Sequence, residues 1–148
     1  MPTTPTATHP AFRLQPGLHV TVQTPQSHLE VILEAIGKIT PLEWGFYDRV
    51  SFTTTPGIQR FRSLGGGQNT ATENVVEVAC VELSFALAAD EKLLEQVLAA
   101  IFHAHPYEEP VIRITEARFT RHVPGMGADS PHKFWNQTDL DWVPPEHR

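Results

Sequence analysis

The chain has 148 residues, a length that usually supports one hydrophobic core, so we expect a single domain. Its 11 Lys and Arg against 17 Asp and Glu give a formal charge of -6 without a basic cluster, so nucleic acid is not an expected partner. The single cysteine and the lack of a leader sequence or an 18-residue apolar run predict a cytoplasmic protein with no membrane association.

The N-terminal part of the chain predicts an arm, a strand and a helix. Residues 1–15 contain three prolines and no hydrophobic period, which predicts a flexible arm. From residue 18 to residue 22, apolar and polar side chains alternate as in a half-buried strand. An amphipathic helix should follow, with Thr24 as its cap, Pro25 in its first turn and Gly37 at its end. Its apolar stripe consists of Leu29, Ile32, Leu33 and Ile36.

The middle of the chain is rich in β-branched and aromatic residues. Residues 44–55 and 58–64 flank Pro56 and Gly57, which predicts two strands joined as a hairpin. The glycine run at residues 65–67 predicts a flexible connection, because no strand-to-helix transition follows it. Residues 75–87 are long for one strand and contain Glu77 and Glu82, so we expect a bend or bulge near their middle.

A second helix should begin after the cap Asp90 and end near Ala104, because Pro106 disfavours helical geometry at His105. Residues 111–119 then predict the last strand. Two strand-helix-strand units predict an α+β, ferredoxin-like fold, an antiparallel sheet with both helices on one face. We place this domain at residues 16–121. Residues 122–148 form a C-terminal extension, and its apolar anchors are expected to dock on this domain or on a neighbouring subunit: Phe134, Trp135, Leu140, Trp142 and Val143.

One segment concentrates chemically active side chains between the second helix and the last strand. Residues 103–110 bring together two imidazoles, a phenol and two carboxylates, which are metal ligands and also groups for proton transfer. On an extended chain Glu108 and Glu109 point to opposite sides, so at most one of them should bind a given ion. The alternative is structural, with His103 at the helix end, Tyr107 packed and both glutamates at the surface.

The string AHPYEEPVI resembles the signature of YqfO-like domains of the NGG-one-interacting-factor-three family, whose insert is similar to CutA and PII proteins. The strings QTPQSHLEVILEAI, GFYDRVSF and IQRFRSLGGG also resemble this family, so the resemblance covers residues 18–119. It implies a ferredoxin-like fold, oligomers that are often trimers, and a metal-responsive or regulatory role. At Arg49 and Val50 the family pattern has His and Cys, which removes an imidazole and a thiol.

We favour a homo-oligomeric binding or regulatory module, a trimer before a dimer, that binds a divalent metal ion or a small ligand near this segment. The expected metal ligands are His103, His105 and Glu108, and the expected ligand-binding residues are Tyr47, Asp48, Tyr107 and Glu109. The roles of Tyr47 and Asp48 are implied by the resemblance alone. Two alternatives stay open. One is a metal-assisted hydrolase with His105 or Glu108 as general base, and the other is a structural or partner-binding protein.

Overall fold

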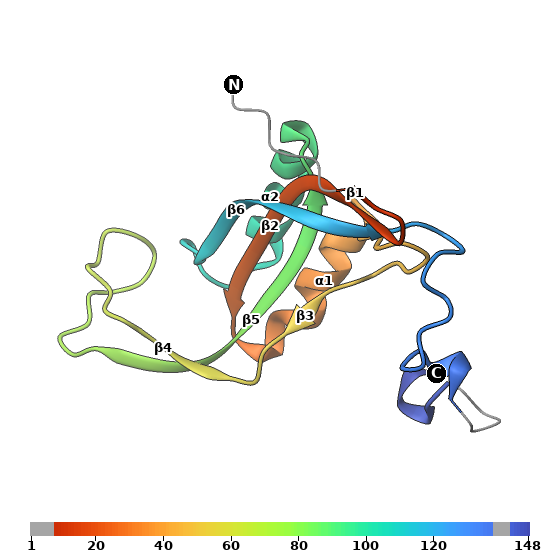
Figure 1. The fold of residues 1–148 in the computed structure, drawn as a ribbon. Helices are drawn as coiled ribbons and strands as arrows, with labels where there is room; N and C mark the ends of the chain where they lie inside the picture. The colour runs from red at the N-terminus through yellow and green to blue at the C-terminus, as the bar shows by residue number, and fades with distance from the viewer. Residues whose placement is uncertain (1–7, 138–142) are drawn as a thin grey trace. The chain divides into compact units, whose positions relative to one another are not determined.

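The computed structural model describes residues 8–137 and 143–148, and the chain folds as an α+β protein (Figure 1). Within these residues neither α-helix has the length and apolar character needed to cross a membrane. The elements in chain order are β1 (Thr8–His9), β2 (Phe12–Thr24), the 3-10 helix η1 (Gln26–His28), α1 (Leu29–Gly37), β3 (Phe52–Thr53), β4 (Gly57–Phe61), β5 (Val76–Ala88), α2 (Glu91–Ala104), β6 (Ile112–His122), and the 3-10 helices η2 (Phe134–Asn136) and η3 (Pro145–His147).

The chain divides into two compact units, and Pro16–Phe119 is the unit that carries both α-helices. Its strands form a sheet in which β2 lies between β5 and β6, and β5 lies between β2 and β3. Residues 17–24 of β2 pair in antiparallel register with residues 81–88 of β5. This strand order, with a helix crossing over in each half, is the ferredoxin-like arrangement that the sequence predicts.

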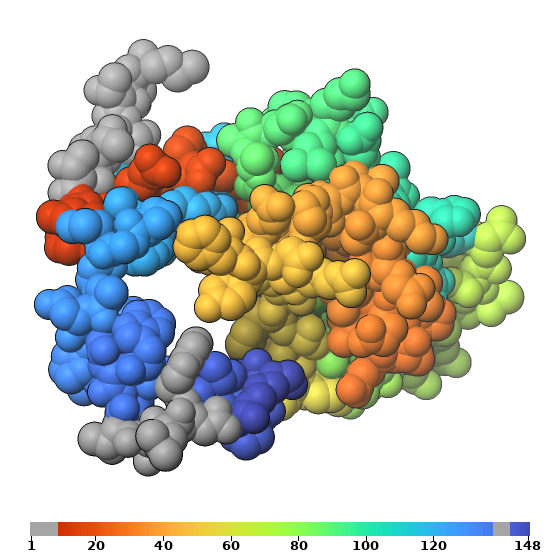
Figure 2. All heavy atoms as spheres, turned by 90° about the vertical axis from the view of Figure 1, so that its right-hand side faces the viewer, coloured from red at the N-terminus to blue at the C-terminus, as the bar shows by residue number. Residues whose placement is uncertain are grey.

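Both α-helices cover one face of this sheet (Figure 1). They pack side by side, as the orange and green surfaces of Figure 2 show. The apolar stripe predicted for the first helix is confirmed, because Ile32 and Ile36 are fully buried, and α2 contributes Val97 and Ile101 to the same core. The core consists of Leu18, Val20, Val22, Ile32, Ile36, Leu42, Leu83, Phe85, Leu87, Val97 and Ile101. Burial of these side chains supplies the main driving force for the fold.

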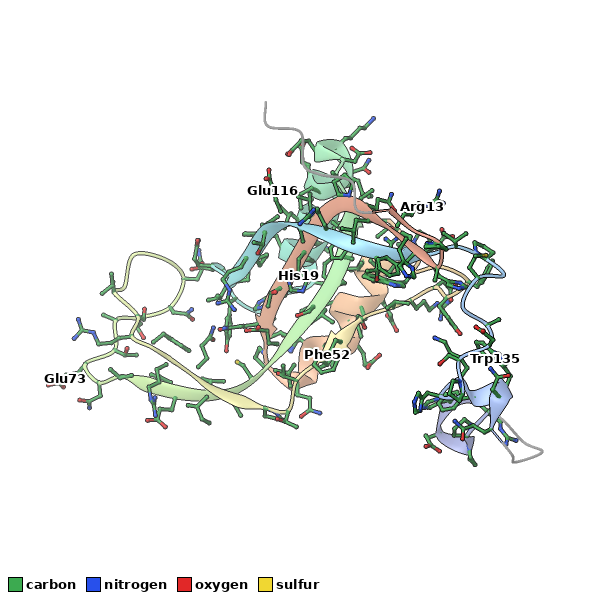
Figure 3. All side chains as sticks on the ribbon, in the orientation of Figure 1. Arg13, His19, Phe52, Glu73, Glu116 and Trp135 are labelled. Carbon is green, nitrogen blue, oxygen red and sulfur yellow. The ribbon has the colours of Figure 1, made fainter. Side chains whose placement is uncertain are left out.

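Neither α1 nor α2 covers the opposite face of the sheet. Thr21 of β2 pairs with Ser84 of β5, and Ser84 also pairs with Phe52 of β3, so these three side chains lie on the same side. His19 is two residues from Thr21 and shares that side. Figure 3 labels His19 and Phe52, and the Phe52 ring is 69% exposed. We call this surface the uncovered face.

The two helices begin in different ways. Asp90 caps α2 as predicted, since its Oδ1 accepts hydrogen bonds from the amides of Lys92 and Leu93 at 3.0 and 3.1 Å. The cap predicted at Thr24 is wrong, because its hydroxyl donates to the carbonyl oxygen of Pro25 at 3.0 Å and caps no helical amide. A 3-10 turn intervenes, and α1 starts only at Leu29.

The predicted hairpin around Pro56 and Gly57 is also wrong. β3 and β4 do not pair with each other, and both pair with β5. β5 is one 13-residue strand whose residues 76–80 pair with β4 and whose residues 81–88 pair with β2. The predicted bend is present, because β4 and the first half of β5 leave the sheet as a curved arm (Figure 1). A local sequence signal could not show that two neighbouring segments share one distant partner.

The second unit combines the described residues before Pro16 with those after Phe119. In the described part of the predicted arm, β1 pairs with the start of β2, and the rings of His9 and Phe12 stack at 4.6 Å. The flexibility of residues 1–15 stays a prediction. In the C-terminal extension the Trp135 indole donates to the carbonyl oxygen of Ala128 at 2.8 Å. Leu140 and Trp142 lie outside the described residues, and docking of the extension stays a prediction.

Candidate functional site

The segment with the concentrated side chains, residues 105–110, joins α2 to β6, and we call it the HPYEEP segment. α2 ends at Ala104, and His105 leaves the helix in an extended conformation with φ of -75° and ψ of 139°. Its amide still donates to the carbonyl oxygen of Ile101 at 2.8 Å. Pro106 accounts for this break, because a proline excludes the helical conformation at the residue before it.

His105 is buried and uses both ring nitrogens. Nε2 lies 2.7 Å from the carbonyl oxygen of Gln23, and the amide of Tyr107 donates to Nδ1 at 3.0 Å. Because Nδ1 accepts that hydrogen bond, the ring proton must be on Nε2, where it donates to Gln23. Burial lowers the pKa of His105 below 6.5; the bond to Gln23 opposes this shift, and the nearby charge of His28 adds to it. The ring is therefore a neutral link between β2 and the HPYEEP segment.

Tyr107 lies against the arm formed by β4 and β5. Its ring centroid is 6.0 Å from that of Phe61, and its hydroxyl is 3.9 Å from the sulfur of the buried Cys80. Burial, followed by the hydrogen bond and charge of Cys80, raises the pKa of Tyr107 to about 12. The phenol thus keeps its proton at physiological pH.

Glu108 reaches across to the glycine-rich loop. Its Oε1 accepts a hydrogen bond from the amide of Gln68 at 3.0 Å. A Cβ atom placed on Gly67 would overlap Oε2 of the same carboxylate, so the missing side chain at residue 67 makes room for Glu108. The HPYEEP segment is consequently attached to β2 by His105 and to the loop by Glu108.

A row of polar side chains crosses the sheet next to this segment. The Gln23 amide group donates to Glu82 at 3.2 Å, and Gln59 donates to Gln23 at 2.9 Å. Arg113 donates to the same Glu82 oxygen at 3.0 Å. The row ends at the Cys80 thiol, whose sulfur lies 3.8 Å from the side-chain oxygen Oε1 of Gln59. Through Cys80 the row meets Tyr107 of the HPYEEP segment.

An open pocket of about 240 Å³ lies over this row, where β3 and β4 separate. Its lining combines polar groups with apolar surface from Ile58 and Val81. The polar lining comes from Gln23, Thr54, Thr55, Gln59 and Glu82, together with the Cys80 thiol. Thr54 is held in place because its hydroxyl accepts from the Glu82 amide and its own amide donates to the Glu82 carbonyl oxygen, both at 3.0 Å.

The predicted site residues do not all gather in one place. His105, Tyr107 and Glu108 contact β2, the arm and the glycine-rich loop, and Glu108 is exposed. His103 in the last turn of α2 and Glu109 are exposed as well. Tyr47 and Asp48 are also exposed and lie in the loop that follows α1. Their joint part in the site stays a prediction.

The loop of Tyr47 lies at the other end of β6 within one chain. Trp44 and Tyr47 exchange backbone hydrogen bonds, and the Trp44 ring contacts that of Phe119 at 5.3 Å. Phe119 is eight residues along an extended strand from Val111, which is roughly 25 Å. Tyr47 can therefore join the HPYEEP segment only if another subunit brings it there.

Two of the three predicted metal ligands, His105 and Glu108, are already engaged in other bonds. Both nitrogens of His105 are hydrogen-bonded, and the Glu108 carboxylate holds the Gln68 amide. Among the described residues no three side chains of His, Cys, Asp or Glu come together as metal ligands would. These positions do not fit a shared ion as they stand, because binding would require exchanging at least one of these bonds.

Comparison with known proteins shows which solved structures have a similar fold. No protein-family model matches the chain, and a search of curated protein sequences finds no match either. Among solved structures, a Bacillus cereus protein related to NIF3 matches with a TM-score of 0.58 and 25% identity. The match covers 70% of this chain and 26% of that protein, so the chain spans about a quarter of its length.

CutA from Xylella fastidiosa matches with a TM-score of 0.51 and 12% identity, over 68% of this chain and 83% of that one. Together these likenesses confirm the CutA-like, ferredoxin-like fold that the AHPYEEP resemblance implies. They agree with the two helices on one face of an antiparallel sheet described above. The roles of the individual side chains have to be argued from their own geometry.

Sequence reasoning missed the polar row and the pocket. The sequence shows Glu82 as a charge within a long strand and Cys80 as the single cysteine, and neither fact predicts a site. Gln23 and Gln59 carry no motif, and they are 36 residues apart in the chain. The available signal was the period of two in β5, which places Glu82 on the side opposite the core. Nothing local predicted which strands would lie beside it.

Proposed function

We propose that the chain is a homo-oligomeric binding or regulatory module whose ligand is a small, uncharged polar molecule. The observation that carries this proposal is the pocket of about 240 Å³ beside the HPYEEP segment. Its volume is below the range of roughly 300–1,000 Å³ for drug-sized ligands, which favours a molecule of one ring or a few heavy atoms.

The polarity of the lining favours an uncharged ligand. Glu82 is the charged side chain among the lining residues, and it already accepts bonds from Arg113 and Gln23. Each carboxamide of Gln23 and Gln59 has two N–H donors and an acceptor oxygen, and the described bonds use only part of this capacity. A ligand with a neighbouring donor and acceptor, such as an amide or lactam, would complement both side chains.

A divalent ion, the other predicted ligand, is less favoured by the contacts. To bind one, His105 would have to release either Tyr107 or Gln23, and the Glu108 carboxylate would have to share its charge with the Gln68 amide. The same bonds weigh against His105 as a general base, because Nδ1 is occupied by a backbone amide. Metal binding is kept as the competing outcome of the experiment below.

Self-association is supported by the uncovered face. On this face Phe52 is a large apolar side chain that is 69% exposed, and a second copy can cover it. We favour a trimer, as the family resemblance implies. In such an assembly Tyr47 and Asp48 of one subunit could approach the HPYEEP segment of another.

The ligand proposal is tested by NMR titration of the isotope-labelled chain with nicotinamide and 2-pyridone, and separately with zinc and manganese ions. We expect saturable shifts of the Gln23 and Gln59 side-chain amides with the organic probes. The variant Gln59→Leu keeps side-chain size and should weaken binding about tenfold or more, since it removes the hydrogen-bonding group. Gln26→Leu, on the exposed start of η1, is the matched control and should bind as the unchanged chain does.

Two results would contradict this proposal. One is the absence of saturable shifts with either organic probe. The other is saturable ion binding that moves the signals of His103, His105 and Glu108 while the pocket amides stay unchanged. The second result would establish the metal site predicted from the sequence in place of the pocket.

A further inference from the structure

The glycine-rich loop, residues 62–75, connects β4 to β5 at the far end of the arm, where Figure 3 labels Glu73. The loop is closed on itself at its base. The amide of Thr72 donates to the carbonyl oxygen of Ser63 at 3.0 Å, and the Ser63 amide donates to the Thr72 hydroxyl at 2.9 Å. It therefore has a defined conformation instead of being the flexible connection that the glycine run predicts.

One side chain from outside the arm reaches this loop. Glu108 accepts the Gln68 amide at 3.0 Å across 40 residues of sequence. Hydrogen bonds to an ionised carboxylate are about twice as strong as neutral ones, so this single contact can hold a loop. Its oxygen atoms occupy the space that any side chain at residue 67 would fill. Gly67 does not have a positive φ, so the reason for glycine here is this close approach and not the backbone conformation.

The attachment of Glu108 also determines where Tyr107 lies. The two residues are adjacent, and Tyr107 contacts Phe61 of β4 and Cys80 of β5. Cys80 in turn lines the pocket, so Tyr107 contacts a side chain of the pocket lining. Release of Glu108 from the loop would free the segment on the side of Tyr107, while His105 would still hold it to β2.

We propose that residues 62–75 are a strap, fastened by the Glu108 carboxylate at Gly67 and Gln68, which keeps Tyr107 in contact with the Cys80 thiol of the pocket lining. A role of the strap in regulating ligand binding rests on the proposed ligand site. The existence of the strap does not depend on that site, and the experiment below tests it without any ligand.

The chain offers two independent ways to unfasten the strap, each with a matched control. Gly67→Ala displaces the carboxylate, whereas Gly66→Ala adds the same methyl group where nothing lies within 4 Å. Glu108→Ala removes the carboxylate, whereas Glu109→Ala removes its exposed neighbour. Thermal unfolding of all four variants verifies that they fold.

The measurements are amide hydrogen exchange of Gln68 and the rate at which Cys80 reacts with the disulfide reagent DTNB. In Gly67→Ala and in Glu108→Ala we expect both rates to rise about tenfold, the effect of losing one hydrogen bond to a carboxylate. The two controls should react at the rates of the unchanged chain. A variant that combines Gly67→Ala with Glu108→Ala should show no further rise in either rate, because both substitutions break the same contact.

The proposal is overturned if Gln68 exchanges at the same rate in the variants and the unchanged chain. It is equally overturned if Gln68 exchange accelerates while the Cys80 rate stays the same, because the loop would then not control Tyr107. If nicotinamide and 2-pyridone do not bind but both rates rise in the variants, the ligand proposal is contradicted. The strap proposal is supported in that case.

Discussion

His105 shows how one residue type supports different roles according to its surroundings. In the sequence, its place in a cluster of imidazoles and carboxylates indicates metal ligation or proton transfer. In the fold it is 7% exposed, and it joins the Gln23 carbonyl oxygen to the Tyr107 amide. A buried neutral imidazole with two satisfied nitrogens is a structural element, and its charge state becomes a property of the fold.

The stability of the protein should therefore depend on the protonation of His105. Burial lowers its pKa below 6.5 in the folded state, so the unfolded chain binds the proton more readily. The contribution of His105 is fully present above pH 6.5 and is lost as the pH falls from there through the lowered pKa. We expect urea unfolding to show decreasing stability as the pH falls below 6.5.

Substitution separates His105 from the other histidines. His105→Ala should lower the free energy of unfolding at pH 7.5 by about 2 kcal/mol, because it leaves a buried carbonyl and an amide unpaired. It should also flatten the decline in stability below pH 6.5. His103→Ala, at an exposed position two residues earlier, should keep both the stability and the decline. An equal pH dependence in the two variants would refute the role assigned to His105.

At the scale of elements, α2 is the part of the fold that local signals describe best. Its cap, its apolar stripe and its end before Pro106 all lie within a short stretch, and each acts on its sequence neighbours. α1 shows the limit of such signals. Thr24 has the residue type of a cap, yet it is buried, and its hydroxyl bonds to the next carbonyl oxygen.

The cap of α2 gives a direct test at this scale. Asp90→Ala removes two hydrogen bonds to the first turn and should lower the free energy of unfolding by about 1 kcal/mol. Asp90→Asn keeps a side-chain acceptor and should cost only a few tenths of that amount. Urea unfolding measures both changes, and an unchanged midpoint in Asp90→Ala would mean that the cap contributes nothing.

At the scale of the whole molecule, the uncovered face is the feature most relevant to assembly. If the chain self-associates through it, sedimentation equilibrium should give a multiple of the 16.5 kDa chain mass, three under the favoured trimer. Phe52→Lys places a charge on this face and should shift the protein toward the monomer. Phe102→Lys, on the exposed side of α2, is the matched control and should leave the mass unchanged. A monomeric unchanged chain would rule out the homo-oligomer.

The sequence by itself determined the two helices, the alternation of the long strands and the ferredoxin-like order. Hydrophobic period, caps and prolines act within a few residues, and the order of strands and helices restricts the possible topologies. It also singled out the HPYEEP segment, although not the roles of its side chains.

Only the tertiary structure decided that β3 and β4 share β5, that Gln23 meets Gln59 and Glu82, and that Glu108 reaches Gly67 and Gln68. These contacts join residues that are distant in the sequence, and even the motif that contains Glu108 does not indicate which residues it meets. Which partner each one meets depends on strand register and on the packing of the complete sheet, and both arise only when distant segments come together.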